Sequence, residues 1–499
     1  MPNRVLLHGA ADSRAVDARA IVELDTPGFE LMQRAAQFAF DRMLVHWSGI
    51  KRITVLCGKG NNAGDAYLVA KLAKQVGLAV QVLALVPPNT LKGDALTAFE
   101  AAVAAGISVD ATTASISGDV VIDGLLGTGI RGQVEGALAA AIASINQAKR
   151  PVLSIDVPSG VMCDSGAIAG TAVNASVTCM FITRKVGLYT GAGVSFAGLR
   201  EYSDLGVPAS FLDTAGALPL LRFDREMLLP LDSNTYKHRQ GHVLIMGGDH
   251  GMPGAVAMAA EAALRVGAGM VTVATRQEHA TPIIARTPEV MVTDVSRFSG
   301  ADETGLAERV DLIAIGPGLG RSAWGEALFE QAVGLAERRT LPLLIDADGL
   351  YWLSQRAVPR VPIFVTPHVA EAARLLGVEA ADVQNDRLHA VDQLRDKFNA
   401  CGVLKGAGSV LFDTHGTAIC AHGNPGMATA GMGDVLSGMA AGLTVQSVAD
   451  SQLLFRAAVL LHSAAADAAA NIVGQRSLLA TDVIAHIYPL LRSTHDATD

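Results

Sequence analysis

The residues best placed to carry out chemistry lie in one glycine-rich segment near the C-terminal end of the chain. Ala430-Gly431-Met432-Gly433-Asp434 precedes an apolar, helix-compatible stretch. Glycines let a backbone come close to a ligand, and the amide groups that open a helix attract anions. Asp434 stands where it can accept a proton from a hydroxyl group that attacks phosphorus. The segment therefore predicts a phosphoryl-transfer site, and the alternative is an N-capped helix after a tight turn.

Further polar groups follow the short apolar runs of the second half. They lie in Gly316-Pro317-Gly318-Leu319-Gly320, Asp346-Ala347-Asp348-Gly349, Thr366-Pro367-His368 with Glu371, and Lys405-Gly406-Ala407-Gly408-Ser409. No Gly-x-x-x-x-Gly-Lys-Ser/Thr motif occurs, so phosphate must be bound in another way. His368 and Glu371 share the first turn of a helix and can address one phosphate or a hydrated Mg²⁺. The alternatives are a histidine satisfied by the backbone and a solvated acid.

Three apolar runs of the first half also end in polar loops. These loops are 58–66, 123–133 and 156–160. Asn62, Asp123, Asp156 and Ser159 bring oxygen atoms that can converge on a hard cation and a polar substrate, although each aspartate alone can be a turn or capping residue. The glycines of 127–132 match Gly-x-Gly-x-x-Gly. Since at least two strands precede them, a nicotinamide-dependent dehydrogenase is not expected.

Composition and charge exclude several classes of protein. The 499 residues are 50% hydrophobic and carry a formal net charge of −9, so the chain can fold into two or more domains and has no general attraction for nucleic acid or anionic lipid. The five cysteines are far apart and form no Cys-x-x-Cys, which argues against a disulfide framework or a zinc site. No segment predicts a signal peptide or a convincing membrane span. We expect a cytoplasmic protein.

Two α/β domains in tandem are the expected architecture. Short apolar runs alternate with alanine-rich, helix-compatible segments, which is typical of a parallel sheet with crossover helices. The runs are 53–57, 80–86, 120–122, 152–155 and 177–182, then 243–246, 270–274, 312–315, 343–345, 363–365 and 410–412. Residues 15–46 predict two helices, and 452–470 predict one long apolar helix. The proline-containing segment 204–231 separates the two series, which predicts domains 1–221 and 222–499.

The first half resembles the NAD(P)H-hydrate epimerase family over most of residues 10–215. The matching pieces are Thr26-Pro27-Gly28 with Leu31-Met32, Gly60-Asn61-Asn62-x-Gly64-Asp65, Asp123-Gly124-Leu125-Leu126-Gly127-Thr128-Gly129, and Asp156-Val157-Pro158-Ser159-Gly160. The expected fold is a Rossmann-like three-layer α/β/α domain. The resemblance implies that the hydrated nucleotide is held by Asn61, Asn62, Ala63, Gly64, Asp65, Gly127, Thr128, Gly129, Ile130, Arg131, Gly132 and Gln133. It implies further that Asn62, Asp123 and Ser159 bind potassium and that Asp156 contacts the reacting centre.

One departure from that family concerns its asparagine-rich loop. The family's loop normally reads Asn-Asn-Gly-Gly-Asp-Gly, whereas this chain has Ala63 and Ala66. If either position needs a positive φ or close approach of a ligand, the activity of the first half is reduced.

The second half, from about 225 to 490, resembles the ADP- or ATP-dependent NAD(P)H-hydrate dehydratases of the ribokinase-like fold. The matching pieces, all in order, are Gly247-Gly248, 262–272, 316–320, Asp346-Ala347-Asp348, Thr366-Pro367-His368, Lys405-Gly406 and 430–438. The resemblance implies that the hydrate is faced by Ala255, Gly318, His368 and Asp434. It also implies that ADP, with Mg²⁺, is held by Lys405, Gly406, Ala407, Gly408, Ser409 and Gly433.

Together the two resemblances imply a bifunctional lyase and isomerase that repairs NADHX and NADPHX. Asp434 would take the proton of the C6 hydroxyl on the hydrated ring, the oxygen would attack the terminal phosphoryl group of ADP, and phosphate would then leave. The first domain would convert the R epimer into the S epimer. The alternative is a small-molecule kinase whose N-terminal half binds a nucleotide or a partner without turnover. Small molecules and a second copy of the chain are the expected partners, without nucleic acid or membrane.

Overall fold

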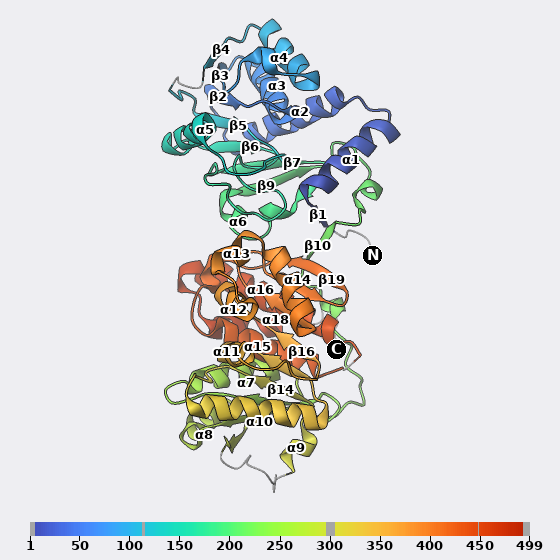
Figure 1. Ribbon diagram of the computed structural model, residues 1–499, viewed down its shortest axis with the longest axis vertical. Helices are drawn as coiled ribbons and strands as arrows, with labels where there is room; N and C mark the ends of the chain where they lie inside the picture. The colour runs from blue at the N-terminus through green and yellow to red at the C-terminus, as the bar shows by residue number, and fades with distance from the viewer. Residues whose placement is uncertain (1–4, 112–114, 296–304, 448, 493–499) are drawn as a thin grey trace. The chain divides into compact units, whose positions relative to one another are not determined.

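The computed structural model describes residues 5–111, 115–295, 305–447 and 449–492. The chain divides into two compact units: unit 1 comprises Met1–Leu220 with Gln384–Asp386, and unit 2 comprises the rest from Leu221 onward. Both units contain a mainly parallel sheet with helices, so the predicted α/β class is confirmed (Figure 1).

Unit 1 is built around a parallel sheet in the order β4-β3-β2-β5-β6-β7-β9. Its strands are β2 (Arg52–Cys57), β3 (Ala79–Ala84), β4 (Val109–Ala111), β5 (Val120–Gly124), β6 (Val152–Ile155), β7 (Val177–Phe181) and β9 (Leu199–Ser203). β2 comes first in the chain, and β3 and β5 pair with it on opposite sides. The strand order therefore reverses between β2 and β5, and ligands bind at such a point in open α/β sheets.

Helices cover both faces of this sheet. They are α1 (Ala10–Glu23), α2 (Gly28–His46), α3 (Asn61–Gln75), α4 (Gly93–Ala104), α5 (Gly136–Gln147) and the short α6 (Gly193–Phe196). Residues of α2, α3 and α4 share one apolar core with Val55, whereas α5 packs on the other face with its neighbour in the chain, Leu56. Short strands β1 (Leu6–His8), β8 (Arg184–Lys185) and β10 (Leu218–Leu221) lie outside this sheet, and β1 pairs with both of the others.

In unit 2 the strand order runs β13-β12-β11-β14-β15-β16-β17-β18-β19. The strands are β11 (His242–Met246), β12 (Met270–Thr275), β13 (Met291–Asp294), β14 (Leu312–Ile315), β15 (Leu343–Ile345), β16 (Ile363–Val365), β17 (Ala400–Leu404), β18 (Val410–Asp413) and β19 (Gly416–Cys420). The strands from β13 to β17 are parallel, and β18 and β19 are antiparallel to their neighbours. Here the order reverses between β11 and β14.

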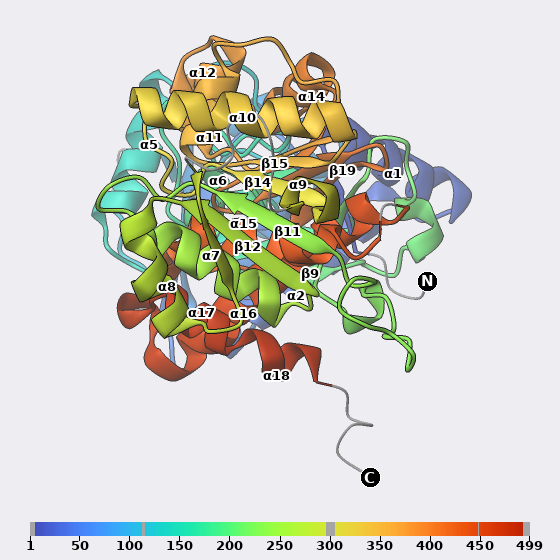
Figure 2. The ribbon, with the colours of Figure 1, turned by 90° about the horizontal axis from the view of Figure 1, so that it is seen from below.

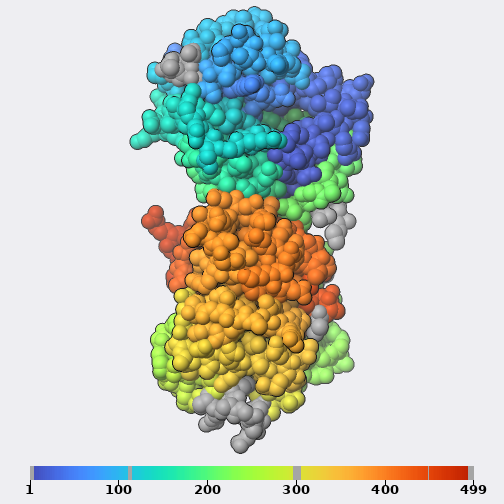
Figure 3. Space-filling model, viewed as in Figure 1, coloured from blue at the N-terminus to red at the C-terminus, as the bar shows by residue number. Residues whose placement is uncertain are grey.

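The helices of unit 2 form two layers. They are α7 (Pro253–Arg265), α8 (Ala280–Arg286), α9 (Leu306–Arg309), α10 (Ala323–Arg339), α11 (Asp348–Leu353), α12 (Val369–Leu376), α13 (Ala380–Asn385), α14 (Arg387–Phe398), α15 (Met432–Thr444), α16 (Ser451–Val473), α17 (Ala480–Ala485) and α18 (Ile487–Leu491). Figure 2 shows α10 on one side of the strands and α7 on the other. In the space-filling view, α10 and the orange segments that follow it form the outer surface of unit 2 on that side (Figure 3).

The predicted apolar helix 452–470 corresponds to α16. Within the part of the chain that the structure describes, α16 is the helix long and apolar enough to cross a membrane, and 78% of its apolar window is buried inside the protein. It packs in the same core as α7 and α15. This extent of burial is typical of a helix in the core of a protein.

The main differences from the sequence prediction concern one helix start and eight strands that were not predicted, which are β1, β4, β8, β9, β10, β13, β17 and β19. β17 was not predicted, because Gly402 interrupts its short apolar run. The segment 58–66 was expected to be a loop, but α3 already begins at Asn61, with Gly60 in extended conformation before it. Asparagine and glycine are favoured both in turns and at helix starts, so composition alone does not separate the two.

Close packing of α15 against α7 depends on Gly438. A Cβ atom added there would lie 2.0 Å from the carbonyl oxygen of Ala259. We expect Gly438→Ala to lower the unfolding free energy by about 1–3 kcal/mol, because such overpacking forces backbone shifts. Gly334→Ala in α10 is the matched control, since its Cβ would meet a single flexible arginine end. A urea titration in which both variants unfold at the same midpoint would contradict this packing.

Candidate active sites

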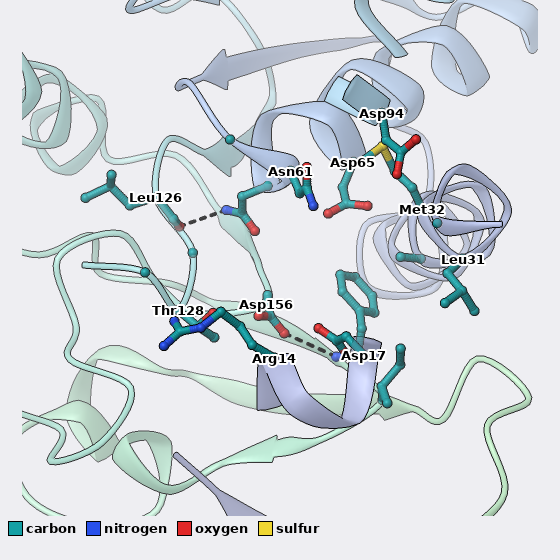
Figure 4. A pocket seen from close by; sticks show the side chains of 18 of the residues that line it. Arg14, Asp17, Leu31, Met32, Asn61, Asp65, Asp94, Leu126, Thr128 and Asp156 are labelled. Atoms are coloured by element: carbon teal, nitrogen blue, oxygen red, sulfur yellow. Dashed lines mark hydrogen bonds between the residues drawn. The ribbon is translucent and has the colours of Figure 1, made fainter. Parts of the chain in front are cut away.

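The first candidate site is a cavity of about 470 Å³ in unit 1 (Figure 4). Eight predicted residues line it: Asn61, Asn62, Asp65, Gly127, Thr128, Gly129, Ile130 and Asp156. They come from the segments after β2, β5 and β6, so the fold brings three distant loops together where the strand order reverses. Five other residues that were predicted to hold the nucleotide do not line this cavity. Ala63 and Gly64 are buried, and Arg131, Gly132 and Gln133 are exposed on the loop beyond.

The two alanines that depart from the family pattern lie inside α3. Ala63 and Ala66 are fully buried in the core of unit 1, and neither has a positive φ. Neither alanine lines the cavity. Their methyl groups therefore face the protein core and not the ligand space, which removes the physical reason to expect a weakened first half.

Asp156 is held in an unusual conformation beside a buried lysine. Its φ is +64°, in the left-handed region that L-residues rarely occupy. The Lys185 ammonium forms an ion pair with the Asp156 carboxylate, and it also donates to the carbonyls of Phe181 at 2.8 Å and Thr183 at 2.9 Å. Backbone strain of this kind gathers at functional sites. Lys185 was missed in the sequence, where the one available signal is a lysine three positions after the apolar run 177–182.

Three more carboxyl groups face this cavity, those of Asp17, Asp65 and Asp94. Asp17, on α1, is half-buried and lies beside the ion pair, and Asp65 is 9% exposed and points into the cavity (Figure 4). Burial raises the pKa of Asp17 to about 6, with Lys185 lowering it and Asp156 raising it. Burial, together with repulsion from Asp156 and Asp17, raises the pKa of Asp65 well above its ordinary value. Asp17 was not predicted as a site residue, because it lies in a helix 139 residues before Asp156 and belongs to no motif.

The three residues expected to bind potassium gather around the backbone of Leu126. Asn62 donates its side-chain amide to the Leu126 carbonyl at 2.8 Å, and the Ser159 hydroxyl accepts from the Leu126 amide at 2.8 Å. Asp123 is fully buried and accepts from the Ser159 hydroxyl at 2.6 Å and the Ser154 hydroxyl at 2.8 Å. Burial raises the pKa of Asp123, although these hydrogen bonds oppose the rise. A buried carboxylate among hydroxyl, amide and carbonyl oxygens is a donor set suited to a hard cation.

The second candidate site is centred on the first turn of α15. Gly431, which precedes this helix, has φ +90°, and a Cβ there would lie 2.7 Å from Met258 Cε. Only glycine fits, and the turn brings Asp434 to the helix start. Burial raises the pKa of Asp434 to about 7, with Asp346 raising it further and Lys405 lowering it. Such a carboxylate takes up a proton near neutral pH, as a general base must.

A network of charged groups surrounds Asp434. Lys405 Nζ donates to Asp346 Oδ1 at 2.9 Å and lies 3.9 Å from Glu371 Oε2, and the Ser437 hydroxyl donates to Asp346 at 2.5 Å. Burial opposes the charge on Lys405, but the two carboxylates outweigh it and raise the pKa of Lys405. Burial alone would raise the pKa of Asp346, but Lys405 and Ser437 lower it. Burial also raises the pKa of Glu371 to about 7.

His368 is the N-cap of α12. Its Nδ1 accepts from the Ala370 amide at 3.1 Å, and Glu371 accepts from the His368 amide at 2.8 Å, which completes a capping box. The histidine is thus satisfied by the backbone, as the alternative prediction held, but its side chain remains 53% exposed. Burial lowers the pKa of His368, and Lys405 lowers it further. A neutral imidazole beside the Lys405 network can still contact a ligand there.

The other predicted residues of the second half lie on neighbouring loops. A Cβ at Gly318 would be 3.1 Å from Ala255 Cβ, so these two residues lie side by side next to the reversal of strand order. A Cβ at Gly433 would be 3.6 Å from Lys405 Nζ. Residues 405–409 connect β17 to β18, with Gly406 and Ala407 exposed and the Ser409 hydroxyl donating to the Gly406 carbonyl at 3.1 Å. The Lys405 side chain therefore turns toward Asp434, while the rest of the loop is open to a nucleotide.

Comparison with known proteins decides the family. Residues 243–489 match the family described as NAD(P)H-hydrate dehydratase, and residues 28–187 match the YjeF-related protein N-terminus. The chain is 41% identical to the bifunctional NAD(P)H-hydrate repair enzyme of Coxiella burnetii, covering 95% of this chain and 97% of that protein. The chain belongs to this family of bifunctional repair enzymes. Both resemblances predicted from the sequence are confirmed.

Two further proteins are similar to this chain. The bifunctional NAD(P)H-hydrate repair enzyme of Escherichia coli is 38% identical, covering 95% of this chain and 92% of that protein. The ADP/ATP-dependent NAD(P)H-hydrate dehydratase from Bacillus subtilis, co-crystallised with ATP/Mg²⁺, is 27% identical with a TM-score of 0.48, covering 53% of this chain and 94% of that one.

Proposed function

We propose that this protein repairs hydrated nicotinamide dinucleotides in two steps carried out by separate units. Unit 1 interconverts the R and S epimers of NADHX and NADPHX, and unit 2 uses ADP to dehydrate the S epimer to NADH or NADPH. The observation that carries the proposal is the pair of separate sites: a cavity with a strained, lysine-paired aspartate in unit 1, and a helix-start aspartate beside a lysine network in unit 2.

In unit 2, Asp434 is the base that takes the proton of the C6 hydroxyl. The oxygen then attacks the terminal phosphoryl group of ADP, and the amides of the first turn of α15 offset the charge that develops there. Phosphate is a far better leaving group than hydroxide, so the ring nitrogen can expel it to give an N1=C6 double bond. Loss of the C5 proton then forms the C5=C6 double bond, returns the electron pair to nitrogen and restores the dihydronicotinamide. Lys405, held by Asp346, supplies a positive charge close to Asp434.

Mg²⁺ fits this site as an ion that binds together with the phosphates of the nucleotide. No group of three or more histidine, cysteine, aspartate or glutamate side chains that could hold a metal ion occurs within residues 5–111, 115–295, 305–447 and 449–492. Mg²⁺ usually keeps several waters and binds through one or two carboxylates and substrate phosphates. Glu371 and Asp434, both with raised pKa values, are the carboxyl groups open to such contacts.

In unit 1, we assign potassium to the oxygen atoms of Asn62, Asp123 and Ser159 around Leu126. Asp123 accepts hydrogen bonds from the hydroxyls of Ser154 and Ser159 and from two backbone amides, all uncharged donors, so a cation would neutralise this buried carboxylate. The ion would fix the loop after β5, which forms one wall of the cavity. The cytoplasmic location and the homo-oligomer remain predictions.

The proposal is tested by adding purified protein to a mixture of R and S hydrate. With ADP, the near-ultraviolet absorbance of the dihydronicotinamide ring should return for both epimers, in a fast phase and a slower one. Without nucleotide it should not return. ATP in place of ADP then decides the preferred nucleotide. A stable phosphorylated product with no recovered absorbance would instead favour the alternative, a small-molecule kinase.

The pH dependence of dehydration should report the titration of Asp434. A base must be ionised, so kcat/KM should rise with pH and level off above an apparent pKa near 7. Because Lys405 lowers the pKa of Asp434, Lys405→Met should move this rise to higher pH. Glu371→Gln is the control, since Glu371 has a similar pKa. Disappearance of the rise in that control would assign it to Glu371 and contradict the role of Asp434.

A further inference from the structure

The unit 1 cavity contains more acid groups than one catalytic aspartate needs. Asp17, Asp65 and Asp156 interact electrostatically with one another, and Lys185 is the cation that acts on them. Asp156 is already matched with Lys185 in an ion pair. Asp65 is nine-tenths buried, points into the cavity, and forms no hydrogen bond or ion pair with the residues that the structure describes. Three carboxyl groups so close together repel one another when all are ionised, which favours a proton retained within the cluster.

Epimerisation at C6 needs such a proton. The carbon bears both a hydroxyl group and the ring nitrogen, so the C6–O bond can break if the oxygen leaves as water and the nitrogen lone pair forms an N1=C6 double bond. A second water must then bond to C6 from the opposite face and lose a proton, while the electron pair of the double bond returns to nitrogen. The reaction therefore requires one acid and one base in the same cavity.

We propose that Asp17 is the acid that protonates the departing C6 hydroxyl, while Asp156 accepts the proton of the incoming water. This assignment rests on the proposed epimerase function of unit 1. Asp156 forms an ion pair with Lys185 and serves as the base. Asp17 comes from a different element, α1, and lies beside that pair, so the two carboxyl groups can address the same carbon (Figure 4).

The burial of Asp17 suits this role. Its side chain is half-buried, so it reaches the cavity and can also recover a proton from solvent. Its raised pKa places it where an acid both holds a proton and releases it near neutral pH. Asp65 is more deeply buried than Asp17, which suits a hydrogen-bond donor to the substrate better than an acid that must recover its proton from solvent in each cycle.

The test uses the full-length protein with the R epimer, ADP and an excess of unit 2 activity, so that epimerisation limits the recovery of absorbance. Asp17→Asn should lower kcat for this phase by about a hundred- to ten thousandfold, with little change in KM and with unchanged dehydration of the S epimer. Asp17→Glu should restore part of the rate. Glu23→Gln, on the same helix but outside the cavity, is the matched control and should behave as the unsubstituted protein.

Isotope labelling tests the bond that breaks without relying on any variant. In water enriched in oxygen-18, the unsubstituted protein should incorporate label at C6 during epimer exchange. The Asp17→Asn protein should lose both the epimer exchange and the incorporation of label. Exchange without incorporation, or full epimerase activity in Asp17→Asn, would overturn the assignment of Asp17. Absence of epimer exchange in the unsubstituted protein is a different result, because it would refute the proposed function of unit 1.

Discussion

Replacing Asp434 with asparagine should abolish dehydration while leaving epimer exchange intact. We expect the ADP-dependent return of absorbance from the S hydrate to fall by about a hundred- to ten thousandfold, because the C6 hydroxyl loses the base that removes its proton. Asparagine has nearly the same shape and still fits the first turn of α15, so the glycine turn before it should persist. Initial rates at saturating ADP and hydrate measure the effect.

Two controls distinguish a loss of catalysis from unfolding of the Asp434→Asn protein. Asp396→Asn removes an aspartate whose side chain is 80% exposed, and it should dehydrate the hydrate at the normal rate. Epimer exchange by unit 1 in the Asp434 variant reports that the protein remains folded. Dehydration retained within about threefold of the unsubstituted rate would remove Asp434 from the mechanism, since a general base contributes far more than that.

Asp156→Asn should produce the opposite separation of activities. We expect epimer exchange to fall by about a hundred- to ten thousandfold, because the carboxylate paired with Lys185 is the base that acts at C6. Asparagine tolerates a positive φ better than most residues, so the backbone at +64° can be kept. With a mixture of epimers and ADP, the fast phase from the S epimer should remain and the slow phase should be lost.

The control for this variant is Asp41→Asn, an exposed change on α2 outside the cavity. It should show both phases. If the Asp156 variant converts the R epimer at the normal rate, the catalytic group of unit 1 lies elsewhere. If it loses both phases, the change has damaged the whole protein, and melting curves would show this.

The positions of the strand ends could be predicted from the sequence. The runs 152–155, 312–315, 343–345 and 363–365 coincide with β6, β14, β15 and β16, because short aliphatic runs bounded by glycine, proline or aspartate admit few other structures. The polar residues that follow parallel strands must then meet at one edge of each sheet. For this reason Asn62 and Asp156 could be expected in one cavity.

The partners of the site residues could not be predicted in the same way. Lys405 was expected to serve the nucleotide, but its ammonium group pairs with Asp346, 59 positions earlier in the chain. Asp17 and Lys185 enter the first cavity from elements outside the matched loops. Such pairings depend on how elements pack in three dimensions, which local residue patterns do not determine. Ala63 and Ala66 show the same limit, because their effect depends on the side of α3 that they occupy.

The fate of the C6 oxygen is the most direct test of whether unit 2 phosphorylates the C6 hydroxyl before it is eliminated. Pure S hydrate carrying oxygen-18 in its C6 hydroxyl should be dehydrated with ADP in ordinary water by the Asp156→Asn protein, so that epimer exchange cannot wash out the label. Phosphorylation followed by elimination predicts that the label appears in the released phosphate, one atom for each dihydronicotinamide restored. Label found in water, with unlabelled phosphate, would show that the C6 oxygen leaves without being phosphorylated and would contradict the proposed mechanism.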